Sequence, residues 1–446
     1  MVNFARIKLL DATRGWAMFF LILLHTGLHL WTGAETEQSG TGATDPFMSI
    51  LIFLVTIGGM YSAVLGAVNA FMFYKRVDSE VNKPRQLVFS GLIACIVLIA
   101  LNFIFRLFFS ADSGMLYFAL RTGSWPDLST IYNHFVLHDS RTIPNFWLIS
   151  SSSLQILGIN SYIIPQILSL SSSGFIKKGK RNWNRVYWVL IITGTAILGL
   201  SLPIRIYLAP ITESLAVNGY PILAWMLGIF VYDNFPIFPI TAFACYGAIV
   251  GLALARGERK KKVYLYTILM FLLFISVGLF GMIRRGGIHP GINYDSDMIA
   301  ILDDFWRHLG QLGMCFGFFS LGLVLFDYAK PEWQRINTRN SQFFTRMGNL
   351  SMSIYIFEGI TAVALGLLLD LIPFLSGWRD SLMGVLIIGA ILALIWGLLN
   401  WGWEKIHYTG SLEWLVITIN KLISGKKSAK FDSKRKELDL IQSTST

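Results

Sequence analysis

Two ionisable residues on one apolar segment are the first in this sequence whose types and spacing indicate chemistry. Arg14 and His25 are eleven positions apart, about three helical turns, so their side chains lie on one face about 16 Å apart. His29 follows one turn later. Ionisable groups in an apolar helix usually face the protein interior or a polar pathway, and histidine transfers protons near neutral pH. His25 is therefore a candidate catalytic residue, with simple hydrogen bonding to a neighbouring helix as the alternative, and His29 is a candidate substrate-binding residue.

Further candidates lie at the ends of apolar segments that the charge pattern below assigns to the outside. Asp45 precedes the second apolar segment, where it could orient an imidazole during catalysis or cap the helix N-terminus. Arg106 lies in the outer half of the third segment. Arg284 and Arg285 end the seventh segment on the side that basic residues normally avoid. These three arginines are candidate substrate-binding residues.

Other ionisable residues carry weaker signals. Glu358 lies midway along the ninth apolar segment and should be protonated or paired. Arg205, near the outer end of the fifth, is expected to extend its guanidinium to the membrane interface. His134 and His138 have a spacing that could hold a metal ion on a helix. No further ligand has a supporting spacing, so no metal site is predicted.

The elements that position these residues are predicted to be membrane helices. Of the 446 residues, 54% are hydrophobic and only 14% are charged, whereas soluble domains carry about 25% charged residues. Apolar runs of about 20 residues indicate transmembrane helices. We predict an all-α, polytopic integral membrane helix bundle of about ten transmembrane helices. The ten segments are 9–32, 46–74, 87–110, 144–170, 187–209, 239–255, 263–283, 309–327, 347–372 and 381–403.

One further apolar stretch, residues 215–235, is ambiguous. A full crossing there would place the basic run at 256–262 on the outside, against the usual sorting of positive charge. We therefore expect a re-entrant or interfacial segment that lies against protein. An eleventh membrane helix is the alternative.

The distribution of basic residues predicts the orientation. With a cytoplasmic N-terminus, 29 of the 37 basic residues fall in segments on the inner side, so both termini are predicted to lie in the cytoplasm of a cell-membrane protein. This topology accounts for the net charge of +11 without a nucleic-acid partner. Residues 1–423 are predicted to form one membrane domain, and residues 424–446 a disordered basic tail.

Several stretches resemble motifs of the transmembrane acyltransferase superfamily. The stretch LDATRGWAMFFLILLH, with its Arg14–His25 spacing, is similar to the first helix of acyltransferase-3 type O-acyltransferases. Further stretches resemble the heparan-α-glucosaminide N-acetyltransferase-like proteins: Asp45 to Phe47, 154–168 and 235–255. Two C-terminal stretches resemble the bacterial YeiB-like proteins: 346–359 and 410–416.

The resemblance implies an acyl-CoA-dependent enzyme embedded in the lipid bilayer. Acyl-CoA, acetyl-CoA in particular, would bind from the cytoplasmic face as a co-substrate, with no permanently bound cofactor. Arg14 would hold its phosphates, and His25 would act as general base or carry the acyl group. The acceptor would be a hydroxyl or amine of an extracytoplasmic glycan or cell-surface polymer. Residues 36–44 lack the histidine and tryptophan of the heparan group, so that group's acceptor is not carried over.

Two other functions remain open. Buried Arg106 and Glu358, together with the interruption at 215–235, would suit a secondary transporter for a small anionic solute. Against a transporter, the sequence has no recognisable inverted repeat, and its ionisable residues gather at the outer ends. A non-enzymatic partner in surface-polymer export is the third possibility. The sequence does not determine the acyl group, the acceptor, the choice of O- or N-acylation, or whether the protein forms a homodimer.

Overall fold

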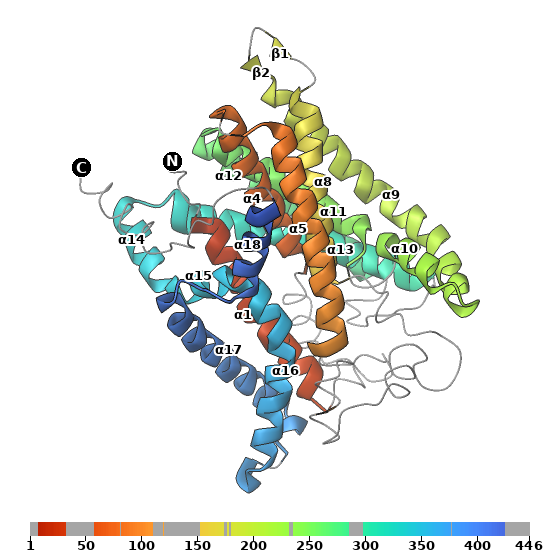
Figure 1. Ribbon diagram of the computed structural model, residues 1–446, viewed down its shortest axis with the longest axis vertical. Coiled ribbons are helices and arrows are strands. Elements are labelled where there is room, and N and C mark those ends of the chain that lie inside the picture. The colour runs from red at the N-terminus through yellow and green to blue at the C-terminus, as the bar shows by residue number, and fades with distance from the viewer. Residues whose placement is uncertain are drawn as a thin grey trace.

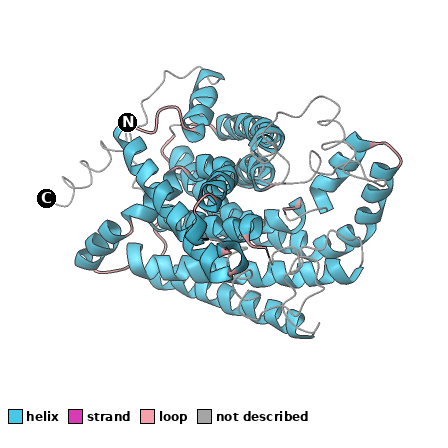
Figure 2. Ribbon diagram, turned by 90° about the horizontal axis from the view of Figure 1, so that it is seen from below, coloured by secondary structure: helices cyan, strands magenta, loops and turns pink. Residues whose placement is uncertain are grey.

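The protein is a bundle of helices in the computed structural model, which describes residues 8–32, 58–80, 82–109, 119, 152–173, 176–177, 180–231, 235–284, 298–375 and 377–423. Helices make up nearly all of this part of the chain (Figures 1 and 2). Two-residue strands β1 (Ile176–Lys177) and β2 (Lys180–Arg181) pair antiparallel at the top of Figure 1. The helices in the first half are α1 (Lys8–Leu30), α4 (Gly58–Asp78), α5 (Pro84–Ile104), α8 (Ser153–Ser173), α9 (Trp183–Val217), α10 (Pro221–Val231) and α11 (Ile237–Ala255). Those in the second half are α12 (Lys260–Arg284), α13 (Met298–Gly322), α14 (Pro331–Asn340), α15 (Gln342–Asn349), α16 (Ser351–Asp370), α17 (Leu382–Lys405) and α18 (Leu412–Ile423).

Seven helices in the described ranges are long and apolar enough to cross a membrane: α5, α9, α11, α12, α13 with its π-helical extension to Asp327, α16 and α17. This confirms the prediction of a helical, multi-pass membrane protein. The remaining three predicted segments coincide with α1, α4 and α8, which do not meet the same measure of length and hydropathy. A helix therefore occupies each of the ten segments predicted from the sequence.

The bounds of three predicted segments are wrong. The fifth was expected to end at residue 209, but α9 continues to Val217. The eighth segment was expected to start at residue 309, but α13 begins at Met298, so residues 298–308, with the ionisable Asp304, Arg307 and His308 among them, extend this helix. The ninth segment was expected to be one helix over 347–372, but the chain breaks at Leu350, between α15 and α16.

Residues 215–235 do not form a full crossing in their described part. Helix α9 continues to Val217, the chain reverses at Gly219 with a φ of 79°, and α10 packs back along α9. Its 11 residues extend about 16 Å, which is shorter than the roughly 20 residues of a transmembrane helix. This geometry fits the predicted re-entrant or interfacial segment.

Besides a small cluster of Leu98, Leu154 and Ile356, the interior of the described residues is divided between two large hydrophobic clusters, and α1 contacts both of these. The larger cluster is built mainly from α4, α8, α9, α11, α12 and α13. The smaller one is built from α1, α15, α16 and α17. Helix α1 contacts α4 and α13 on one side and α15, α16 and α17 on the other. The helix that carries Arg14 and His25 is thus held between the two halves of the bundle.

Small residues bring α4 and α11 into close contact. A Cβ atom placed on Gly247 would lie 2.0 Å from the carbonyl oxygen of Ala63, and one on Gly251 would lie 1.9 Å from that of Ala67. Nothing larger than glycine fits at these two positions without moving a helix. The G-x-x-x-G spacing in α11 therefore serves helix packing, as it does in other membrane helices.

Candidate functional site

His25 contacts a buried carboxylate from a distant part of the chain. Its Nδ1 atom forms a short contact with Oε1 of Glu358 on α16. The Glu358 side chain is 3% exposed and the His25 side chain is 26% exposed. The prediction that Glu358 is protonated or paired is thus confirmed, with His25 as its partner. When Nδ1 donates its proton to the carboxylate, Nε2 is the nitrogen that can accept one.

Neighbouring side chains contact both His25 and Glu358. The ring of Tyr355, one turn before Glu358, lies 6.5 Å from the ring of His25. On the other side, Thr361 donates from Oγ1 to the Glu358 carbonyl oxygen (2.9 Å) and accepts from Nε1 of Trp396 on α17 (3.2 Å). Within the described residues, the second carboxylate oxygen of Glu358 is buried and accepts no hydrogen bond. Much of the electrostatic compensation of this carboxylate must therefore come from His25.

The structure places Arg14 on the same helix, near its N-terminal end. Its guanidinium pairs with Asp11 at 3.1 Å, and its side chain is 32% exposed. Between Arg14 and His25, Met18 and Ile22 are fully buried in the smaller cluster. Leu21, which shares the face of Arg14 and His25, is half-buried. A ligand running between these two ionisable residues would therefore follow Leu21 and not the Met18–Ile22 stripe.

The two C-terminal stretches that resemble YeiB-like proteins meet in space. The Glu413 carboxylate on α18 accepts hydrogen bonds from the backbone N–H groups of Met352 (2.6 Å) and Ser353 (3.1 Å) and from the Ser353 hydroxyl (2.6 Å). These N–H groups belong to the first turn of α16, where a helix has no internal acceptors. Glu413 therefore replaces a local cap and stabilises the break at Leu350.

Glu413 also makes stability depend on pH. Burial raises the pKa of this carboxyl group, and the hydrogen bonds from Ser353 and Met352 only partly oppose that effect. A raised pKa in the folded state gives stability that is fully present below the unfolded pKa of about 4.3 and is lost as pH rises through the folded pKa. We expect Glu413→Gln to remove this pH dependence in thermal unfolding. Glu413→Ala should lower stability by about 1–3 kcal/mol at any pH, because it leaves buried donors unpaired. Identical pH profiles for the wild type and Glu413→Gln would contradict this role.

A second buried group of charges was not found from the sequence. Asp304 forms ion pairs with Arg205 and Arg307, and its carboxylate lies 3.3 Å from Nδ1 of His308. Arg205 is 8% exposed and donates from Nε to the carbonyl oxygen of Val231 at 3.1 Å. The expectation that Arg205 reaches the membrane interface is therefore wrong, because its partners lie in the interior and it caps the C-terminal end of α10. The i, i+3, i+4 spacing of the α13 residues was the available sequence signal.

The remaining predicted residues do not enlarge the site. Arg284 lies at the exposed end of α12, with its guanidinium 5.4 Å from the centre of the Phe280 ring. The side chains of His29 and Arg106 lie outside the described part of the structure, although both positions are helical. Asp45, Arg285, His134 and His138 also lie outside the described residues, as does the tail from residue 424.

The chain matches no protein-family model and no curated protein. Its function is therefore inferred from the geometry of the described residues. The His25–Glu358 pair, with Arg14 at the other end of the same helix, is thus the arrangement from which function is inferred.

Proposed function

We propose that the protein is a membrane acyltransferase. It would move an acyl group, acetyl in the simplest case, from cytoplasmic acyl-CoA to a hydroxyl or amine of an extracytoplasmic glycan or cell-surface polymer. The observation that supports this proposal most strongly is the contact between His25 and buried Glu358. A histidine held in one tautomer by a carboxylate is well suited to general-base catalysis.

In the proposed reaction, Nε2 of His25 takes the proton of the acceptor as the acceptor oxygen or nitrogen attacks the thioester carbonyl carbon. The new ester or amide bond forms, the carbon–sulfur bond breaks, and the imidazolium returns its proton to the departing CoA thiolate. Glu358 touches neither reactant and is a positioning residue. Its charge stabilises the imidazolium that forms during the transfer. Transient acylation of His25 is the alternative route with the same overall balance.

Arg14 is proposed to hold the phosphates of acyl-CoA at the inner end of α1. Its ion pair with Asp11 uses one terminal nitrogen, and the guanidinium has further donors with which it can bind a phosphate in a bidentate manner. The distance of about 16 Å along the helix between Arg14 and His25 then sets how far the pantetheine arm must extend. Acyl-CoA is a substrate in this scheme, and no resident cofactor is proposed.

The proposed topology has ten crossings, with α10 as a re-entrant segment and both termini in the cytoplasm. The basic strand pair lies at the top of Figure 1 and the C-terminal end of α16 at the bottom, as inner and outer ends of the bundle would. Helix α1 then starts on the inner side with Arg14 and ends on the outer side beyond His25. Acyl transfer would take place near the outer face of the cell membrane.

Glu358→Gln tests the positioning role. We expect the transfer rate to fall about 10- to 100-fold, less than the full 10²–10⁴ contribution of a general base, because the amide can still accept from Nδ1. The loss should appear in kcat with an unchanged KM for acetyl-CoA, because Glu358 touches neither reactant. The assay follows labelled acetyl groups from acetyl-CoA into the cell-envelope polymer.

Glu404→Gln is the matched control for this substitution. Glu404 also forms an interhelical ion pair, with Arg346 at 2.8 Å, but it lies on another part of the bundle. Its substitution should leave kcat unchanged. An unchanged kcat in Glu358→Gln would remove Glu358 from the mechanism.

A proton-coupled transporter is the second candidate, and the same pair favours it. Glu358 is buried midway along α16 and contacts a histidine on a facing helix, as proton-relay groups in transporters do. In that case the wild type should take up a labelled anionic solute in proteoliposomes without transferring acetyl groups. Acetyl transfer without such uptake would exclude this candidate.

A further inference from the structure

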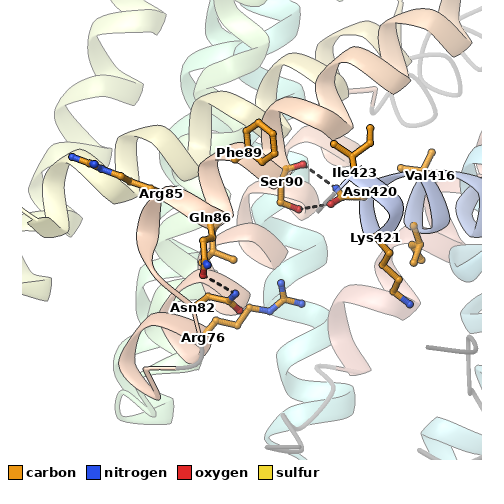
Figure 3. A pocket seen from close by; sticks show the side chains of 12 residues that line it. Arg76, Asn82, Arg85, Gln86, Phe89, Ser90, Val416, Asn420, Lys421 and Ile423 are labelled. Carbon is orange, nitrogen blue, oxygen red and sulfur yellow. Dashed lines mark hydrogen bonds between the residues drawn. The ribbon is translucent and has the colours of Figure 1, made fainter. Parts of the chain in front are cut away.

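A cavity of about 600 Å³ lies between the α4–α5 turn and α18 (Figure 3). Its described lining contains three basic residues and no carboxylate: Arg76, Arg85 and Lys421. Neutral polar side chains and apolar side chains complete the lining. The cavity therefore favours an anionic ligand that also has an apolar part.

The basic side chains are unequally placed around this cavity. In Figure 3, Arg76 and Lys421 extend into the space between the turn and α18, whereas Arg85 extends toward the opposite side. Asn420 ties α18 to α5, accepting from the Ser90 hydroxyl (2.9 Å) and donating to the Ser90 carbonyl oxygen (3.0 Å). These hydrogen bonds hold α18, which carries Lys421, against the α5 wall of the cavity.

The apolar surface next to the cavity is continuous with the lipid-facing side of a membrane helix. On α5, Phe89, Leu92 and Ile96 are 51%, 37% and 61% exposed, and their i, i+3, i+7 spacing puts them on one face. On α18, Leu422 and Ile423 are 73% and 56% exposed. A phospholipid joins a phosphate through glycerol to apolar chains, whereas a nucleotide has no apolar chain to cover these side chains.

We propose that this cavity binds the phosphate of an anionic phospholipid through Arg76 and Lys421, with the acyl chains lying along the Phe89–Leu92–Ile96 face of α5. Basic pockets between membrane helices on the cytoplasmic side commonly bind anionic head groups. Acyl-CoA and inorganic phosphate also carry phosphate groups, so these two soluble compounds are the alternative ligands of the cavity. The proposal does not depend on acyl transfer.

The test is a titration of the purified, delipidated full-length protein with single phospholipids, followed by native mass spectrometry. The wild type should bind phosphatidylglycerol at least about tenfold more tightly than phosphatidylcholine. A basic residue near an anionic surface contributes a factor of about five, so Arg76→Gln/Lys421→Gln should weaken phosphatidylglycerol binding about 30-fold. Phosphatidylcholine binding should not change.

Three controls separate this site from general effects. Lys261→Gln removes an exposed cation outside the cavity and should leave the phosphatidylglycerol affinity unchanged. Arg76→Lys keeps the charge and should retain most of the binding. If the double variant fails to fold, each single variant should still show a loss of about fivefold.

Two outcomes would overturn the proposal. The first is equal affinity of the wild type and the double variant for phosphatidylglycerol. The second comes from a parallel titration with acetyl-CoA and with inorganic phosphate. If the double substitution weakens binding of either soluble ligand and leaves lipid binding unchanged, the cavity belongs to a soluble phosphate compound and not to a phospholipid.

Discussion

His25→Ala is expected to lower acetyl transfer by about 10²–10⁴-fold, the usual contribution of a positioned general base. The side chain is 26% exposed and does not belong to either hydrophobic cluster, so the protein should still fold and insert. The substitution also removes the described hydrogen-bond partner of Glu358, so the amount of folded protein is measured alongside the rate. The loss should therefore appear in kcat, with little change in acyl-CoA affinity.

The measurement compares labelled-acetyl transfer with the amount of folded protein, determined by gel filtration in detergent. His407 provides a matched control, because it is a half-buried histidine outside the site. Its φ of 56° is tolerated by asparagine, so His407→Asn should transfer acetyl groups at the wild-type rate. Full activity in His25→Ala would remove this histidine from the chemistry.

Gly251→Ala is expected to destabilise the protein severely. The added Cβ would lie 1.9 Å from the carbonyl oxygen of Ala67, and the obstructing atom is backbone, so no side-chain rotation relieves the clash. Overpacking costs about 1–3 kcal/mol when side chains can adjust, and here α4 and α11 must separate. The thermal unfolding midpoint should fall sharply, and little folded protein should be recovered from membranes.

Gly199→Ala is the same chemical change on α9, and nothing lies within 4 Å of its added Cβ. It should stabilise the helix by about 0.5–1 kcal/mol, the usual gain when alanine replaces glycine inside a helix. Equal midpoints for the two variants would show that the close approach of α4 and α11 does not limit stability.

Hydropathy was sufficient to locate the helices, because a run of about 20 apolar residues has few alternatives to a helix in lipid. Hydropathy was not sufficient to locate the first and last residues of the helices. Helix α13 can include residues before 309 because the Asp304 carboxylate pairs with Arg307, His308 and the distant Arg205 inside the protein. A hydropathy average over neighbouring residues scores this stretch as a polar loop. It cannot take account of Arg205, which lies about a hundred positions away.

The break before α16 has a similar cause. The N–H groups of Met352 and Ser353 are satisfied by Glu413, which follows them by some sixty residues. The N-cap position of α16 is Leu350, and no side chain forms a local capping hydrogen bond there. Sequence inspection therefore extended the ninth segment through Leu350.

The individual residues of the candidate site were predictable from the sequence, but the contact between His25 and Glu358 was not. The type and spacing of Arg14 and His25 identified α1, and the cost of a charge inside an apolar segment showed that Glu358 needs a partner. That the partner is His25 depends on α1 packing against α16, which one sequence does not reveal. Asp45 was the expected orienting carboxylate, and it lies outside the described residues.

The central claim is that a CoA thioester binds along α1, with Arg14 at its phosphates and His25 at its acyl group. It is tested most directly by equilibrium binding of acetyl-CoA to the purified wild type, Arg14→Ala and His25→Ala. The account predicts saturable binding by the wild type, about tenfold or weaker binding by Arg14→Ala because a charge-assisted contact is lost, and near wild-type affinity for His25→Ala. A wild type with no affinity for acetyl-CoA or for longer acyl-CoAs would contradict it.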